Sequence, residues 1–96
     1  MQPSVRETSI AAYHELRDDG KLTAKQQQIT DYLHRHNGAD FSRLEISRAI
    51  DMPINCVAGR VNELLEKGVI EEADQRPCRI SGRRINPIRL TQGRLL

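Results

Sequence analysis

The segment 54–70 most constrains the fold of this chain, because it combines a strong helical pattern with a definite end. Its sequence is INCVAGRVNELLEKGVI, in which apolar residues recur at the spacing of an amphipathic helix. Pro53 suits the first helical position, since its missing N–H would be unpaired there, and Gly68 suits a left-handed C-terminal cap. The run VIEEA that follows changes to a strand-like pattern. The segment therefore predicts a helix to about Lys67 followed directly by a strand.

Three earlier helices are predicted from capping boxes, in which Ser or Thr is followed three residues later by Glu or Gln. The pairs are Ser4 with Glu7, Thr23 with Gln26, and Ser42 with Glu45. They begin an N-terminal helix over about 5–17, a second helix that ends at the NG of 37–38, and a third that ends near Ile50. The N-terminal helix has only a thin apolar stripe, so it either packs lightly on the domain or serves as a dimerisation element.

The chain after the strong helix predicts a β-hairpin over about 69–91. A second strand-like run, INPIRLT at 85–91, follows a polar, turn-rich segment that contains Pro77 and the SG of 81–82. Pro87 cannot donate a hydrogen bond to a strand ladder, so it confines the returning strand to an edge or a bulge. The hairpin would have a long tip that carries arginines.

These elements in this order predict one domain over 1–96, mainly α-helical with a small β-hairpin (α+β). Ninety-six residues with three aromatic side chains are enough for one small aliphatic core. Two helices joined by a three-to-four-residue turn over about 42–67 have the helix-turn-helix arrangement, in which the second helix can enter the major groove of DNA. A hairpin directly after that helix is a wing, so we expect a winged helix-turn-helix.

Gly59 lies in the middle of the strong helix, where glycine costs about 1 kcal/mol relative to alanine. At 100° per residue the apolar side chains, from Ile54 to Leu65, fall within an arc of about 120°, and Gly59 falls on the opposite side. Asn and Arg can bond adenine and guanine edges, and a glycine between them would let the backbone approach a duplex. The predicted recognition residues are Asn55, Cys56, Gly59, Arg60 and Asn62. The alternative is a solvated face on a slightly unstable helix.

Charge is distributed unevenly along the chain. Residues 75–96 contain six arginines and no acidic residue, so their net charge is +6, whereas the whole chain carries +2. A concentrated basic patch is typical of nucleic-acid binding, although a basic end can also serve solubility alone. Four of these arginines lie in the predicted wing, where tip side chains should bury little and can reach phosphates or a minor groove. They are Arg76, Arg79, Arg83 and Arg84.

Other classes of function have little support in the sequence. The two cysteines and three histidines show none of the short spacings of a zinc site, and the cysteines are expected to be free thiols. There is no glycine-rich phosphate loop and no nucleophile beside an obvious base, so we expect neither an enzyme nor a cofactor. No signal-peptide run and no stretch of 18 apolar residues is present, which favours a soluble cytoplasmic protein without membrane contact.

Four stretches, TSIAAYHEL, LTAKQQQI, NCVAGRVNELLEKGVIEE and CRISGRR, occur in this order and span most of the chain. Together they resemble small phage and prophage winged-helix proteins of the MarR-like kind. The resemblance implies binding of double-stranded DNA, with transcription regulation in a bacterium or a phage-infected cell as the expected role and a homodimer as a further expected partner. The chain lacks the long C-terminal dimerisation helix of full-length MarR regulators. The alternative is a protein-interaction winged helix in a replication or recombination assembly.

Overall fold

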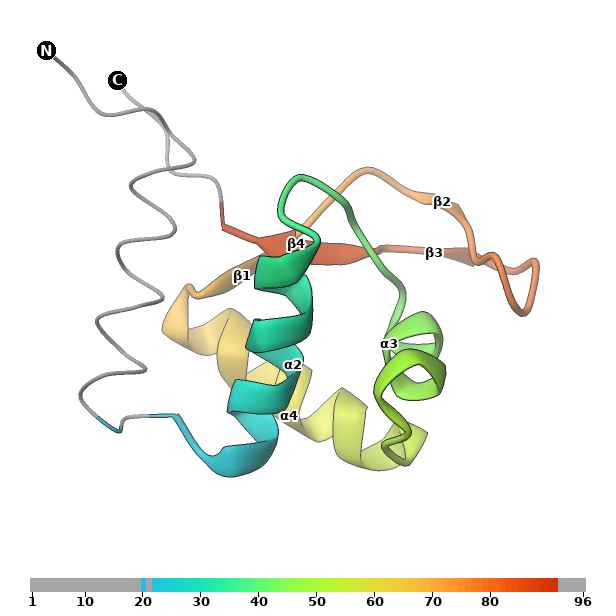
Figure 1. Cartoon of the computed structure of the whole chain (residues 1–96). Coiled ribbons are helices and arrows are strands. Elements are labelled where there is room, and N and C mark those ends of the chain that lie inside the picture. The colour runs from blue at the N-terminus through green and yellow to red at the C-terminus, as the bar shows by residue number, and fades with distance from the viewer. Residues whose placement is uncertain (1–19, 21, 92–96) are drawn as a thin grey trace, which may run out of the picture.

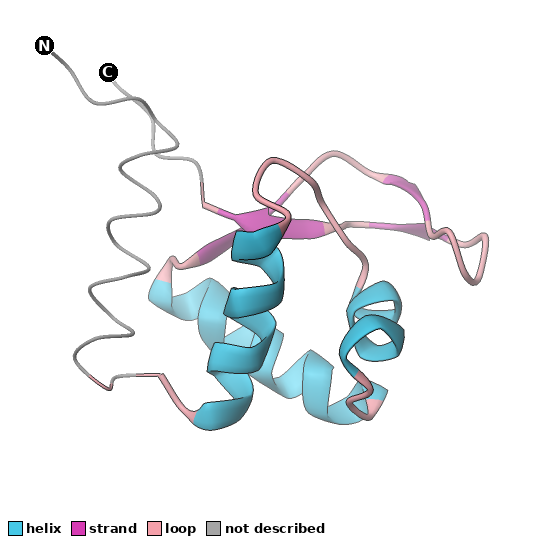
Figure 2. Cartoon of the chain, viewed as in Figure 1, coloured by secondary structure: helices cyan, strands magenta, loops and turns pink. Residues whose placement is uncertain are grey.

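The computed structural model describes residue 20 and residues 22–91, and these form an α+β arrangement of three helices and a β-hairpin. The helices are α2 (Ala24–Arg35), α3 (Arg43–Ile50) and α4 (Ile54–Lys67). The strands are β1 (Ile70–Glu72), β2 (Arg76–Pro77), β3 (Arg84–Ile85) and β4 (Ile88–Leu90). The helices lie on one side of the hairpin, and the hairpin tip extends beyond α3 (Figures 1 and 2). The helix expected over 5–17 lies outside the described residues.

Local capping signals explain where the helices begin and end. Thr23 and Ser42 each form a complete capping box, with Gln26 and Glu45 as the reciprocal partners, as predicted. Gly68 ends α4 in the left-handed conformation, also as predicted, with φ 76°. α4 begins one residue later than expected. Pro53 has an extended ψ of 141°, so it is the N-cap of α4 and not the first helical residue.

The hairpin consists of two short paired regions separated by an interruption. β1 pairs antiparallel with β4, and β2 pairs antiparallel with β3. Pro87 lies in the interruption, where its carbonyl accepts a hydrogen bond from the N–H of Ala73 at 2.8 Å. Phe41 adds an isolated antiparallel bridge to Ile88 on the strand that Pro87 precedes. The sequence predicted that Pro87 confines the returning strand to an edge or a bulge; in the structure Pro87 lies between β3 and β4, outside both paired regions.

An aliphatic core joins the three helices to the base of the hairpin. Each helix contributes side chains of less than 2% exposure, and so do β1 and β4. The most deeply buried ones include Ile29, Leu33, Ile46, Val57, Val61, Leu64, Ile70 and Ile88. α2 and α3 both pack against α4, which fixes the position of α4 in the domain.

Candidate nucleic-acid interface

The outward face of α4 is open at Gly59. Apart from its chain neighbours and the backbone of its own helix, a Cβ atom added to Gly59 would meet no described heavy atom within 4 Å. Asn55 and Asn62, which precede and follow it on the same side of the helix, are both exposed. The prediction that Gly59 points away from the core is therefore confirmed, and close packing against a described helix does not explain this glycine.

Arg60 lies at the margin of this face and is held by Glu63 of the same helix. Its Nη2 donates to Glu63 Oε2 at 2.9 Å, and its Nε lies 2.8 Å from Oε1 without hydrogen-bonding geometry. Oε1 also accepts from the side chain of Gln26 on α2 at 2.7 Å. The hydrogen bond from Gln26, and then that from Arg60, lower the pKa of the Glu63 carboxyl below its ordinary value. Arg60 is one-third exposed, so exchange of this ion pair for a ligand would cost little.

Two side chains of α4 differ from the faces that the helical spacing predicted for them. Cys56, expected on the outward face, packs against the core. Ile54, expected in the buried arc, is 46% exposed. Cys56 is half-buried against the core cluster, whereas Ile54 is the first residue of the helix. A uniform angle per residue does not include the positions of neighbouring helices.

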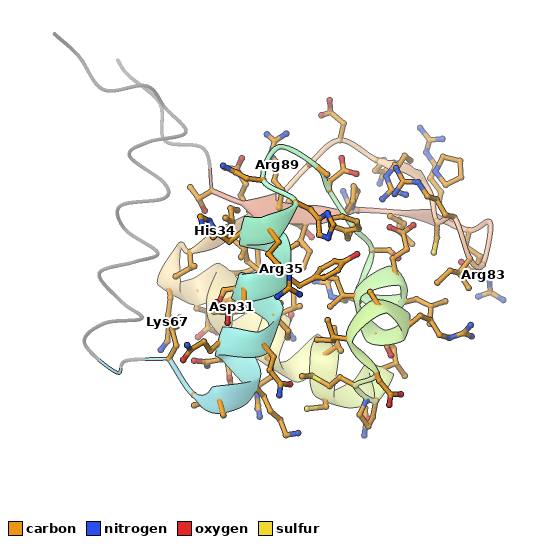
Figure 3. All side chains as sticks on the ribbon, in the orientation of Figure 1. Asp31, His34, Arg35, Lys67, Arg83 and Arg89 are labelled. Atoms are coloured by element: carbon orange, nitrogen blue, oxygen red, sulfur yellow. The ribbon has the colours of Figure 1, made fainter. Side chains whose placement is uncertain are left out.

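The tip of the hairpin is a closed turn that presents arginines. The N–H of Cys78 donates to the carbonyl of Arg83, and the N–H of Gly82 donates to the carbonyl of Cys78, each at 2.8 Å. Gly82 has a φ of 73°, which favours glycine at this position. Three arginine side chains at the tip are exposed, and Figure 3 shows Arg83 at the far end of the hairpin. We call Arg79, Arg83 and Arg84 the tip arginines.

Arg76 occupies a different environment, and the expectation that all four wing arginines bury little is wrong for it. Its side chain is only 20% exposed. Nε donates to Asp40 Oδ1 at 2.8 Å, and Nη2 donates to Glu45 Oε1 at 2.7 Å and to the Asp40 carbonyl at 3.1 Å. Nη1 donates to Glu45 Oε2 at 3.0 Å and to the Pro77 carbonyl at 2.9 Å. Since a guanidinium has five N–H groups, all of them are used within the protein.

Glu45 joins the outer part of the hairpin to the start of α3. It completes the capping box of α3 with Ser42 and binds the guanidinium of Arg76, and Oε2 also accepts the backbone N–H of Arg79 at 2.8 Å. Its side chain is 7% exposed. The hydrogen bonds from Arg76, and then those from the N–H groups of Arg79 and Ser42, lower the pKa of Glu45 to about 2. The ionised carboxylate of Glu45 therefore helps to hold the tip against the start of α3, together with Asp40, which also binds Arg76.

Cys78 is buried beneath the tip and touches the same cap. Its Sγ lies 3.2 Å from the Ser42 hydroxyl oxygen. This contact, followed by the backbone N–H of Ser81, lowers the pKa of the Cys78 thiol to about 7. Both cysteines are free in the structure. We assign Cys78 a packing role, because its side chain is covered.

Sequence reasoning missed the attachment of Arg76 to Asp40 and Glu45. The capping box identified Glu45 as a helix-start residue, but its ion-pair partner lies 31 residues later in the chain. A run of arginines in a turn-rich segment does not distinguish an anchoring side chain from exposed ones. The only hint in the sequence was an acidic residue, Glu45, at the start of a helix that was expected to pack in the domain.

Among residue 20 and residues 22–91, no group of three or more His, Cys, Asp or Glu side chains could hold a metal ion. None of the helices in this part of the chain has the length and apolar character needed to cross a bilayer. Comparison of the chain with protein-family models, curated proteins and solved structures found no match.

Proposed function

We propose that this protein is a winged helix-turn-helix protein that binds double-stranded DNA. In this proposal α4 lies in the major groove and the hairpin is a wing whose tip arginines contact phosphates or the adjacent minor groove. The observation that carries the proposal is the open face of α4 at Gly59, bordered by the exposed amides of Asn55 and Asn62. Asparagine can bond adenine in a bidentate manner, and a residue without a side chain lets the helix backbone come close to base edges.

The arrangement of α3 and α4 supports this function. The two helices are separated by only three residues, 51–53, as in a helix-turn-helix. Pro53, the N-cap of α4, makes no side-chain capping hydrogen bond, and of the first N–H groups of the helix that of Cys56 donates to Asn55 Oδ1 at 3.0 Å. The N-terminus of a helix attracts phosphate through such N–H groups and through the helix dipole. The end of α4 that would contact bases is therefore also suited to approach the DNA backbone.

The distribution of ion pairs indicates which arginines would contribute to phosphate binding. Arg60 and Arg76 are engaged by carboxylates, and Arg89 is paired with Glu71 across the strands at 2.9 Å. The tip arginines remain exposed, although Arg79 also lies 3.6 Å from Glu45. We therefore assign the phosphate contacts of the wing to the tip arginines and not to Arg76. Regulation of transcription in a bacterial or phage-infected cell is the role that the sequence resemblance adds to this proposal.

The proposal is tested by titrating labelled duplexes, selected from a random pool by the wild-type protein, at several salt concentrations. Replacing the tip arginines by alanine should lower the slope of log affinity against log salt by up to about 2.7, at about 0.9 per phosphate contact. The matched control is the double substitution Lys25→Ala and Arg35→Ala. Both side chains are exposed on α2, which packs against the buried side of α4, so the slope should not change.

A second candidate is docking of α4 on a protein partner. It is favoured by the exposed Ile54 at the start of α4 and by the pairing of Arg60 with Glu63, which leaves the helix face close to neutral. Such a partner would bind with a weak dependence on salt, whereas duplex binding weakens steeply through release of counterions. If the wild-type protein selects no duplex from the pool, the DNA proposal is rejected and this candidate takes its place.

A further inference from the structure

Ile80 is an exposed apolar side chain at the end of the hairpin. Its exposure is 41%, and among the described residues Ile54 is the one other large hydrophobic side chain that is similarly exposed. Single exposed apolar side chains are common on protein surfaces, so the exposure alone has no functional meaning. The position of Ile80 is what distinguishes it. Ile80 directly follows Arg79 in the sequence and lies three residues before Arg83.

The turn that carries Ile80 is held by hydrogen bonds at its base. Cys78 and Arg83 are joined across the turn, and Gly82 bonds back to Cys78, so residues 78–83 form a closed unit. The N–H of Arg79, the residue before Ile80, donates to the buried carboxylate of Glu45. Arg76, three residues before Arg79, is bound to the same carboxylate. Ile80 is therefore presented by a turn that is fixed to the start of α3, and this turn extends past the helices (Figure 1).

We propose that Ile80 is a wedge that inserts between base pairs from the minor groove and bends the bound duplex. Proteins that bend DNA from the minor groove combine arginines, which are attracted by the negative potential of the groove, with an apolar side chain that unstacks a base step. The hairpin tip has both parts, since Arg79 and Arg83 lie in the same short turn as Ile80 and Arg84 directly follows it at the start of β3. This inference rests on the proposed binding of double-stranded DNA and adds a deformation of that DNA.

Insertion of Ile80 should cost little conformational entropy, because the turn that carries it is already ordered in the free protein. A side chain on a mobile loop would have to be ordered as it enters the groove, whereas the turn at 78–83 is already closed by its own hydrogen bonds. Pyrimidine–purine steps unstack most easily, so the wedge should favour duplexes that contain TA or CA steps beside the site of α4. Sequence preference would then extend to base pairs that no side chain reads by hydrogen bonding.

The experiment measures the shape of DNA as well as its binding. A duplex selected by the wild-type protein is labelled with a dye pair at its ends for energy transfer, and a second copy carries 2-aminopurine at a TA or CA step flanking the major-groove site. We expect the wild-type protein to bend the duplex by about 20 to 90° and to raise the 2-aminopurine fluorescence through unstacking. Ile80→Ser should bind with the bend reduced below about 20° and without the rise in fluorescence. Ile80→Leu, which keeps an apolar side chain of the same volume, should restore both signals.

Several results would overturn the inference, and they are distinguishable. If the wild-type protein binds a straight duplex, or if Ile80→Ser bends DNA as strongly as the wild type, the wedge is rejected while DNA binding stands. If the wild-type protein binds no duplex, the wedge is rejected together with the proposed function. Binding to vesicles of anionic phospholipid that depends on Ile80, with no change in DNA shape, would reassign the tip to a membrane surface. Thermal melting of each variant verifies the fold, because Ile80 is exposed.

Discussion

Replacing Arg76 by alanine should destabilise the domain far more than replacing any of the tip arginines. The guanidinium of Arg76 joins the hairpin to Asp40 and Glu45, and its side chain is only 20% exposed. Its removal leaves the carboxylate of Glu45, which is 7% exposed, with the backbone N–H groups of Ser42 and Arg79 as its hydrogen-bond donors. When a buried charge loses its ion-pair partner, the attraction to that partner is lost, but the desolvation penalty of the charge remains.

The pKa of Glu45 gives the size of the effect. Its decrease from 4.5 to about 2 corresponds to roughly 3 kcal/mol of preferential stabilisation of the ionised form in the folded protein. Arg76 is the largest cause of that decrease, but the two backbone N–H groups also contribute and remain in the variant. We therefore expect Arg76→Ala to lower the free energy of unfolding at pH 7 by about 2 kcal/mol, which is on the order of 10 °C in Tm for a domain of this size.

The effect should depend on pH with a definite sign. The depressed pKa of Glu45 contributes stability that is complete above the unfolded value near 4.5 and is lost as the pH falls through about 2. Arg76→Ala raises the folded pKa of Glu45 toward its ordinary value. The difference in unfolding free energy between wild type and variant should therefore decrease by more than about half between pH 7 and pH 3.

Urea unfolding followed by circular dichroism, at pH 7 and at pH 3, measures these differences. Arg84→Ala is the matched control, because that arginine is exposed and its Nε makes one side-chain hydrogen bond, to Gln75 at 3.3 Å. The control should change stability by less than about 0.5 kcal/mol. Equal effects of the two substitutions, or a difference that does not decrease at low pH, would show that the Arg76 network does not hold the hairpin in place.

Three further predictions concern α4 and the cap of α3. Gly59→Ala should stabilise the free protein by roughly 0.5 to 1 kcal/mol through helix propensity, whereas Gly59→Leu should keep the fold and weaken duplex binding; a collapse of the Tm with leucine would contradict the open face. Asn55→Ala and Asn62→Ala should each cost about 1 to 3 kcal/mol on a selected duplex and much less on random DNA, and equal losses on both would exclude base reading. Ser42→Ala should cost about 1 kcal/mol in urea unfolding because it removes the capping hydroxyl, and no change would mean that water replaces the cap.

Much of the secondary structure could be predicted from the sequence alone, because its signals are local. The capping boxes at Thr23 and Ser42, the left-handed end of α4 at Gly68 and the irregularity at Pro87 each involve residues within about four positions of one another, or the backbone of one residue. The outward direction of Gly59 also followed from helical periodicity. Hydrogen bonds and backbone preferences of this range do not depend on the rest of the fold.

Tertiary structure alone decided what individual side chains do within those elements. Arg76 and Arg79 lie in the same basic, turn-rich segment of the sequence, yet one is enclosed by Asp40 and Glu45 and the other is exposed. Cys56 packs against the core although helical spacing places it on the outward face of α4. Burial and charge pairing depend on which distant segments meet in space, and the two partners of Arg76 lie 31 and 36 residues away from it in the chain. The sequence by itself therefore determined the order and ends of the elements, whereas packing between them separated the anchoring arginine from those that face solvent.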